Sequence, residues 1–221
     1  MTLPDDIAGQ INRVPQNRNR PLLICDADEV LLQFARTLEA FLDDAGYALH
    51  LESFRLHGNV RDARTGLPAD ADTVTTLLQR FFLERVAQCP PVDGAVGALE
   101  TLSARADIVV LTNVPMAALE ARRNAMAAYG LAYPVIANTG GKGPAVRALA
   151  GERQAPVIFM DDLPSNHASV ADHAGHVHRV HFVADPRLGP LIGASDHAHT
   201  RIDHWPAAQQ YLDRHLRNAG F

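Results

Sequence analysis

Acidic, hydroxyl and amide residues directly follow three short apolar runs of this sequence. Asp26 and Asp28 follow LLIC, Thr112 and Asn113 follow IVVL, and the pair DD at 161–162 follows VIFM. In a parallel sheet the carboxyl ends of the strands share one edge, where such sheets bind ligands. We therefore expect these side chains to converge on one crevice.

The predicted crevice holds several acids, and its chemistry follows from their charge. Carboxylates packed together repel one another and cannot all remain ionised without a cation. Mg²⁺ is a hard divalent ion that prefers oxygen ligands. Lys142, in the stretch TGGKGPAV, would offset further charge, unless it is a solvated surface lysine. Such a site suits a phosphoryl group, whose transfer requires positioning and charge neutralisation.

The elements that must position these side chains alternate along the chain. Apolar runs predict strands at 22–25, 107–112, 155–160 and 177–183, with a weaker one at 133–138. Helical patterns lie at 31–47, 72–88, 92–105, 114–130 and 142–151. This alternation predicts an α/β fold, with a Rossmann-like, mainly parallel sheet flanked by helices.

One region breaks the alternation and indicates an inserted unit. Residues 36–90 show helices and a polar loop but no convincing strand. We expect a small α-helical cap, inserted after the first strand and placed over the carboxyl ends of the sheet. The catalytic core then comprises 21–35 and 91–221, and the polar residues 1–20 form a mobile N-terminal lead-in.

Four motifs in order resemble those of the haloacid-dehalogenase-like hydrolase superfamily. They are ICDADEV, VVLTN, Lys142 within GGKG, and FMDD. The resemblance extends over residues from about 21 to 185, with 36–90 matching as a cap of the expected size and position. Asp28 favours phosphoryl chemistry, because dehalogenases of this type lack an acid there. Glu29 departs from the pattern, since the family usually has glycine after the second aspartate.

The resemblance implies a role for each motif residue. Asp26 would be the nucleophile that attacks phosphorus and forms an aspartyl-phosphate. Asp28 would protonate the leaving oxygen and then activate water. The Thr112 hydroxyl and the Asn113 backbone would hold phosphate oxygens, and Lys142 would pair with the nucleophile and the phosphate.

The resemblance also implies a Mg²⁺ cofactor and a reaction. The ion would be held by Asp26, the main-chain carbonyl of Asp28 and Asp162, with Asp161 bound directly or through water. The expected activity is hydrolysis of a small phosphomonoester. Two alternatives remain: a phosphomutase that acts on a sugar phosphate with the same motifs, and a non-catalytic binding or regulatory protein with this fold.

Composition limits the partners. The formal net charge of −5 argues against binding to nucleic acid or to anionic membranes. No apolar run approaches the roughly 20 residues that cross a bilayer. Two cysteines without a CxxC pair cannot form a disulfide framework or a cysteine zinc site. We expect a cytoplasmic monomer or homodimer with a phosphorylated small-molecule substrate.

Two further groups of residues leave alternatives open. The loop at 52–66 carries Arg55, His57, Arg61 and Arg64, which either bind a second anionic group of the substrate or form a solvated surface. Nine of the 11 histidines lie beyond residue 160. A zinc site or alternating positions on an exposed strand would explain them, and no carboxylate or cysteine spacing supports the zinc.

Overall fold

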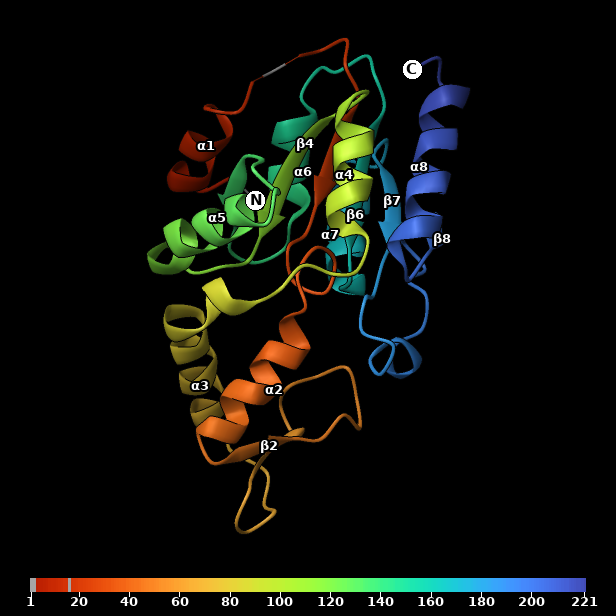
Figure 1. The fold of residues 1–221 in the computed structure, drawn as a ribbon. Coiled ribbons are helices and arrows are strands. Elements are labelled where there is room, and N and C mark those ends of the chain that lie inside the picture. The colour runs from red at the N-terminus through yellow and green to blue at the C-terminus, as the bar shows by residue number, and fades with distance from the viewer. Residues whose placement is uncertain (1–2, 16) are drawn as a thin grey trace.

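The computed structural model describes residues 3–15 and 17–221, and a six-stranded sheet lies at its centre (Figure 1). All strand pairs in this sheet are parallel, which confirms the predicted α/β class. The strand order is β5-β4-β1-β6-β7-β8. The strands are β1 (Leu22–Cys25), β4 (Asp107–Thr112), β5 (Val135–Ala137), β6 (Val157–Asp161), β7 (His178–His181) and β8 (Thr200–Arg201).

Helices cover both faces of the sheet (Figure 1). One face packs against α4 (Ala95–Ser103), α5 (Leu119–Ala128) and α8 (Trp205–Asn218). The other packs against α1 (Asp5–Ile11), α6 (Gly143–Ala150) and α7 (Pro164–His173). In β1 the side chains of Leu23 and Cys25 join the first core, and those of Leu22 and Ile24 join the second. The strand reads as a continuous apolar run because both of its faces are buried.

The N-terminal segment is partly a structural element, so the expectation of a mobile lead-in is wrong for α1. Ile7 and Ile11 are buried against the sheet side that carries α6. The Gln10 side chain donates a hydrogen bond to the Ala137 carbonyl at 3.2 Å and accepts one from the Ala137 amide at 2.9 Å. It thereby supplies the edge strand β5 with the backbone partners that a further strand would offer.

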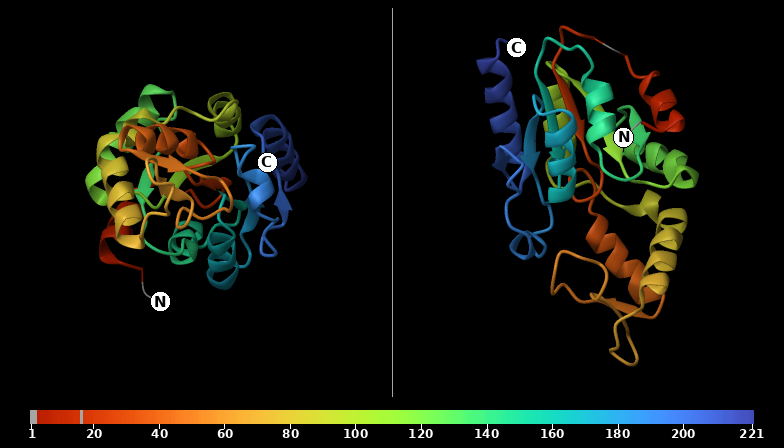
Figure 2. Two further views of the ribbon diagram at one scale, coloured as in Figure 1. Left: turned by 90° about the horizontal axis from the view of Figure 1, so that it is seen from below. Right: turned by 180° about the vertical axis from the view of Figure 1, so that it is seen from behind.

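The insert at 36–90 differs from the expectation because it contains strands. It is built from α2 (Phe34–Asp44), a hairpin of β2 (Tyr47–Leu49) and β3 (Val60–Asp62), α3 (Ala71–Glu84) and the short 3₁₀ helix η1 (Val86–Gln88). Strands of three residues are too short to show a period of two in the sequence. Figure 1 and the right view of Figure 2 place α2, α3 and the hairpin beyond one end of the sheet.

The remaining elements are short connections. They are the 3₁₀ helices η2 (Met116–Ala118) and η3 (Gly189–Leu191), which precede α5 and β8. Among the described residues, no helix has the length and apolar character needed to cross a membrane.

Candidate active site

The register of the sheet brings the predicted acids together. Cys25 at the end of β1 lies opposite Met160 on β6, and the Asp26 amide donates to the Met160 carbonyl at 2.9 Å. Asp26 and Asp161 are therefore the next residues on two adjacent parallel strands. The strand order also reverses beside β1, because the chain returns from β5 to place β6 on the other side of β1. Ligands bind at such a switch point in open α/β sheets.

Three buried carboxylates meet at this point. One oxygen from each of Asp26, Asp161 and Asp162 lies within 4.8 Å of the others, and no other group of three metal-ligating side chains occurs in the described residues. Burial raises the pKa of Asp26 to about 7, and the charges of Asp161 and Asp28 add to this. Burial and the same cluster raise the pKa of Asp162 well above its usual range. The cluster thus needs a cation before all its members ionise.

Lys142 supplies one such charge and is a buried residue rather than a solvated one. Its Nζ lies 2.7 Å from Asp26 Oδ1 and 2.7 Å from Asp161 Oδ2, and its side chain is 1% exposed. Burial lowers the pKa of Lys142, but the charges of Asp161 and Asp26 outweigh burial and raise it. Lys142 is also the only lysine in the sequence, whose other 19 basic residues are arginines. A compact ammonium fits between two carboxylates where a planar guanidinium is too wide.

Two glycines explain how the loop before α6 places Lys142. A Cβ at Gly143 would overlap the Ser169 carbonyl on α7, and one at Gly141 would crowd the Ser169 hydroxyl. The Gly143 amide also donates to that hydroxyl at 3.0 Å. The glycines of the GGKG motif therefore permit the close approach of α6 to α7 that buries the lysine.

Asp161 and Asp162 are in different surroundings. Asp161 Oδ1 accepts hydrogen bonds from the Leu163 amide and from Asn166 Nδ2, both at 2.9 Å, while its Oδ2 accepts from Lys142. No described residue donates a hydrogen bond to the Asp162 carboxylate, although this residue is only 8% exposed. Asp161 thus orients its neighbours, and Asp162 is free to bind an ion.

Asp28 has a partner that the sequence analysis did not identify. An oxygen of Asp28 lies 2.7 Å from Arg122 Nη2 on α5, and the Arg122 side chain is fully buried. The contact fixes one side of the Asp28 carboxylate, while 20% of that side chain stays exposed. The α5 sequence LEARRNAMAA contains a second arginine one residue later, so nothing in its pattern singled out Arg122.

Glu29 occupies the position where glycine was expected, and it keeps the backbone conformation of a glycine. Its φ is +57°, in the left-handed region that is unfavourable for residues with a Cβ. Its buried carboxylate accepts hydrogen bonds from the Ala35 amide in the first turn of α2 at 2.7 Å and from the Asp185 amide at 3.1 Å. These bonds tie the turn after β1 to the insert and to the loop after β7, and they offset the strain. Burial raises the pKa of Glu29 to about 7.

Thr112 and Asn113 end β4 beside the cluster. The Thr112 hydroxyl is buried and has no hydrogen-bond partner among the described residues, so it could bind an oxygen of a ligand. The Asn113 side chain is already engaged: its Nδ2 donates to the Gly140 carbonyl at 3.0 Å, and its Oδ1 accepts from Asn138 at 2.8 Å. These bonds connect the end of β4 to the loop that carries Lys142.

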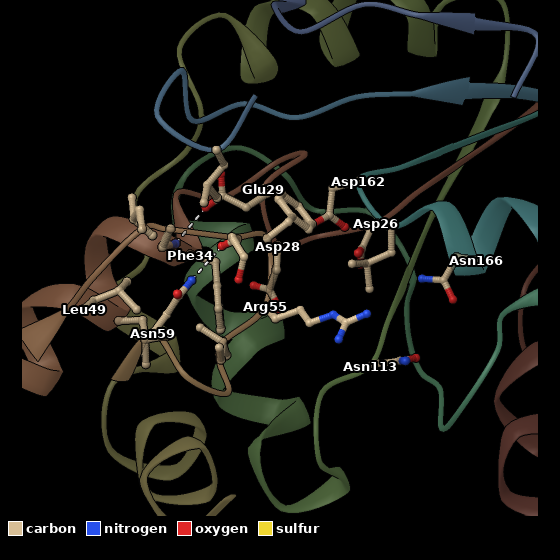
Figure 3. Close-up of a pocket in the computed structure, with 18 of the residues that line it drawn as sticks. Asp26, Asp28, Glu29, Phe34, Leu49, Arg55, Asn59, Asn113, Asp162 and Asn166 are labelled. Atoms are coloured by element: carbon tan, nitrogen blue, oxygen red, sulfur yellow. Dashed lines mark hydrogen bonds between the residues drawn. The ribbon is translucent and has the colours of Figure 1, made fainter. Parts of the chain in front are cut away.

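A cavity of about 240 Å³ lies between this cluster and the insert (Figure 3). The predicted site residues that line it are Asp26, Asp28, Asn113, Lys142 and Asp162, whereas Thr112 and Asp161 lie behind its surface.

Arg55 is the one basic residue of the loop at 52–66 that lines the cavity. It forms no ion pair with a described residue, and Figure 3 shows its guanidinium extending toward the side of Asp26 and Asn113. Arg61 pairs instead with Glu52 at 3.3 Å, outside the cavity.

The C-terminal histidines form no cluster of metal ligands among the described residues. His178 stacks between the rings of His199 and His215, with centroids 4.6 and 4.1 Å apart, and accepts or donates a hydrogen bond with the Tyr211 hydroxyl. His181 bonds through Nε2 to the Asp162 carbonyl at 2.9 Å, which helps to hold the loop after β6. These histidines therefore have structural partners of their own.

Several solved structures share the fold of the whole chain. A haloacid-dehalogenase family hydrolase from Deinococcus radiodurans R1, solved with phosphate and sodium, has a TM-score of 0.58 at 16% identity, over 90% of this chain and 97% of that one. The YfnB protein of Bacillus subtilis, provisionally named a hydrolase of this type and solved with magnesium, has a TM-score of 0.56 at 13% identity, over 89% and 100% of the two chains.

A further similar structure has a different provisional name. This protein of Bacteroides vulgatus is named as a β-phosphoglucomutase, and it has a TM-score of 0.53 at 14% identity, over 97% and 96% of the two chains. No protein-family model and no curated protein sequence matches this chain. Similarity over nearly the full length of these structures, at low identity, establishes the architecture: the chain has the haloacid-dehalogenase-like fold.

Proposed function

We propose that the protein is a Mg²⁺-dependent phosphatase that hydrolyses a small phosphomonoester through an aspartyl-phosphate. The observation that carries the proposal is the buried cluster of Asp26, Asp161 and Asp162 with Lys142 at the end of the cavity. Phosphoryl transfer depends on positioning and charge neutralisation. The cluster offers a carboxylate as the nucleophile, a fixed ammonium, and a further carboxylate that is free to bind a cation. The similar structures solved with phosphate and with magnesium support this choice of chemistry.

The donor set fits a hard divalent cation. No described residue donates a hydrogen bond to the buried Asp162 carboxylate. Burial raises the pKa values of Asp26 and Asp162, the neighbouring carboxylates add to this, and the charge of Lys142 does not cancel it. Mg²⁺ would be held by Asp26, Asp162 and the main-chain carbonyl of Asp28. Asp161, whose oxygens already accept three hydrogen bonds, would act through water or by positioning. When bound, the ion would neutralise charge on the phosphoryl oxygens.

The residues of the chain would divide the reaction between them. The Asp26 carboxylate attacks phosphorus, and Asp28 gives a proton to the leaving oxygen. In the second step Asp28 takes a proton from the water that releases phosphate. Lys142 keeps Asp26 in place and neutralises phosphate charge. A phosphate bound deeper than the present cavity surface would give the unpartnered Thr112 hydroxyl an oxygen to bind. Movement of the insert as a cap would admit substrate and then exclude water.

Hydrolysis of para-nitrophenyl phosphate tests the proposal. We expect phosphate release that depends on added Mg²⁺ and stops with a chelator, and that resumes when Mg²⁺ is restored in excess. Full activity in the presence of the chelator would reject the metal-dependent mechanism. A phosphomutase, which one similar structure brings into consideration, would instead be stimulated by a sugar bisphosphate and release no free phosphate.

Replacing Asp28 with asparagine is expected to affect substrates according to their leaving group. General acid catalysis contributes about 10²- to 10⁴-fold, so hydrolysis of an alkyl phosphate should fall by a factor in this range. Release of para-nitrophenolate, which needs no proton, should persist as a single burst, because the second step then lacks its base. Stopped-flow absorbance measures the burst. Equal losses for both esters and no burst would show that Asp28 is not the acid.

A further inference from the structure

We infer that the alcohol portion of the substrate is an apolar group of about the size of a phenyl ring or a hexyl chain, rather than a sugar. The inference rests on the proposed phosphatase function and specifies its substrate class. Figure 3 shows that the cavity has two sides: Asp26, Asp162 and Asn166 lie at one, and Phe34 and Leu49 lie at the other. A phosphate placed on the acidic side would direct the rest of the ester toward the apolar side.

The apolar side is built by elements that are anchored elsewhere in the fold. Its walls include Phe34, Leu38, Leu49, Phe54, Leu56 and Phe82. Phe34 packs edge-on against Phe81 with ring centroids 5.2 Å apart, and Phe82 packs in the same way against Phe81 at 5.6 Å. Phe54 packs against a small buried cluster of Ala35, Val183 and Leu188. The walls are therefore continuous with the hydrophobic cores and are not a solvated surface.

Few polar groups on this side remain to bind a hydroxyl. The Asn59 amide group already donates to the Ser53 carbonyl at 2.6 Å. Arg55 is directed toward the acidic side, where it would meet phosphate oxygens. A sugar placed against these walls would find only the Ser53 hydroxyl and the Asn59 side-chain oxygen to replace its hydrogen bonds to water, whereas an alkyl or aryl group would gain from burial.

The volume of the cavity sets the size of the group. An apolar protein cavity of about 150 Å³ holds a benzene molecule. The cavity here measures about 240 Å³, so it has room for a ring of that size beside a phosphate. A longer lipid chain would extend beyond it into solvent and gain no further burial there.

Binding of alkyl phosphonates tests the inference separately from turnover, because their carbon–phosphorus bond is not cleaved by this chemistry. Isothermal titration with Mg²⁺ present would compare hexylphosphonate, ethylphosphonate and dihydroxypropylphosphonate. A single methylene in a hydrophobic pocket changes affinity by about 10-fold or more, so we expect hexylphosphonate to bind at least about 100-fold more tightly than the other two. Equal affinities, or tighter binding of the hydroxylated compound, would overturn the inference.

Two adjacent residues of α3 provide a matched pair of variants. Phe82 lines the cavity, whereas Leu83 is 61% exposed. Phe82→Gln should reduce the preference for hexylphosphonate over ethylphosphonate by about 10-fold, and Leu83→Gln should leave it unchanged. Phe54→Gln, on a different wall, repeats the test if Phe82→Gln does not fold. An unchanged preference in a folded Phe82→Gln or Phe54→Gln protein would contradict the proposed site.

The same ligands separate this inference from the proposed function. If the protein hydrolyses para-nitrophenyl phosphate but prefers glycerol phosphate over hexyl phosphate, the function stands and the substrate class is wrong. If it binds hexylphosphonate with the expected preference but hydrolyses no phosphate ester, the pocket stands and the phosphatase proposal is wrong. The glycerol ester compared is the 3-phosphate, which like hexyl phosphate is an ester of a primary alcohol, so the comparison reports on the pocket rather than on leaving-group chemistry.

Discussion

Asp26→Asn is expected to reduce turnover of para-nitrophenyl phosphate by at least about four orders of magnitude. Losses of this size follow when a nucleophile is removed from an active site that acts as a unit. An amide nitrogen or oxygen cannot replace the carboxylate that attacks phosphorus, although it has nearly the same shape. Phosphate release under saturating substrate and Mg²⁺ measures the effect.

The interpretation of that variant depends on an intact fold. Asp26 contacts the Ala27 amide at 2.7 Å as well as Lys142, so its replacement is expected to change stability, and circular dichroism must show that Asp26→Asn is fully folded at the assay temperature. Asp43→Asn, at an exposed position on α2, is the matched control and should keep full activity. Residual activity above about one tenth in a pure, folded Asp26→Asn protein would exclude Asp26 as the nucleophile.

Lys142→Met is expected to have the largest effect on stability, with a concurrent loss of activity. The substitution leaves Asp26 and Asp161 buried without the ammonium that each contacts at 2.7 Å. Removal of one partner from a buried ion pair costs about 3–5 kcal/mol of the free energy of unfolding. Urea denaturation at pH 8 measures this loss. Arg147→Met, which removes an exposed cation from the helix that begins directly after Lys142, should change stability by less than about 0.5 kcal/mol.

The loss in Lys142→Met should depend on pH in a defined direction. In the metal-free wild type, burial raises the pKa of Asp26 from 3.8 to about 7, so the folded state binds this proton more tightly than the unfolded chain. Such a group favours folding at low pH, and its contribution disappears as the pH rises through that window. The charge of Lys142 lowers the pKa of Asp26 and of Asp162, so without it these two carboxyl groups would hold their protons more strongly. The variant should therefore be closer to wild type at pH 5 than at pH 8, and added Mg²⁺ should recover part of the loss at pH 8. A destabilisation independent of pH would contradict this electrostatic explanation.

The sheet and its acidic edge could be predicted because their signals are local. A strand that is buried on both faces must be apolar along its length, as LLIC at 22–25 and IVVL within β4 are. The residues that follow such strands lie at one edge whenever the strands are parallel. Asp26, Asp161 and Lys142 could therefore be expected to meet before any coordinates were known.

Other features depend on contacts between distant parts of the chain, which a single sequence does not reveal. The segment that forms α1 is mostly polar, and its helix packs on the sheet through Ile7 and Ile11 and through the bond of Gln10 to Ala137, 127 residues away. Nothing in the local sequence indicates these contacts. The buried Arg122 on α5 pairs with Asp28, which lies in the turn after β1 and is far from it in the sequence. Glu29 keeps a left-handed backbone because amides from α2 and from the loop after β7 converge on its carboxylate. The apolar walls of the cavity likewise appear only when α2, the hairpin and α3 are assembled.

Trapping of the covalent intermediate tests the central claim most directly. Asp28→Asn protein is mixed with para-nitrophenyl phosphate and Mg²⁺, quenched in acid within the burst, digested and analysed by mass spectrometry. We predict one para-nitrophenolate released per active site and one phosphoryl group on the peptide that contains Asp26, with none on the same peptide of an Asp26→Asn, Asp28→Asn double variant. Two results would contradict the account. One is a phosphoryl group on a residue other than Asp26. The other is an Asp28→Asn protein that shows neither a burst nor a labelled peptide although the wild-type enzyme turns over.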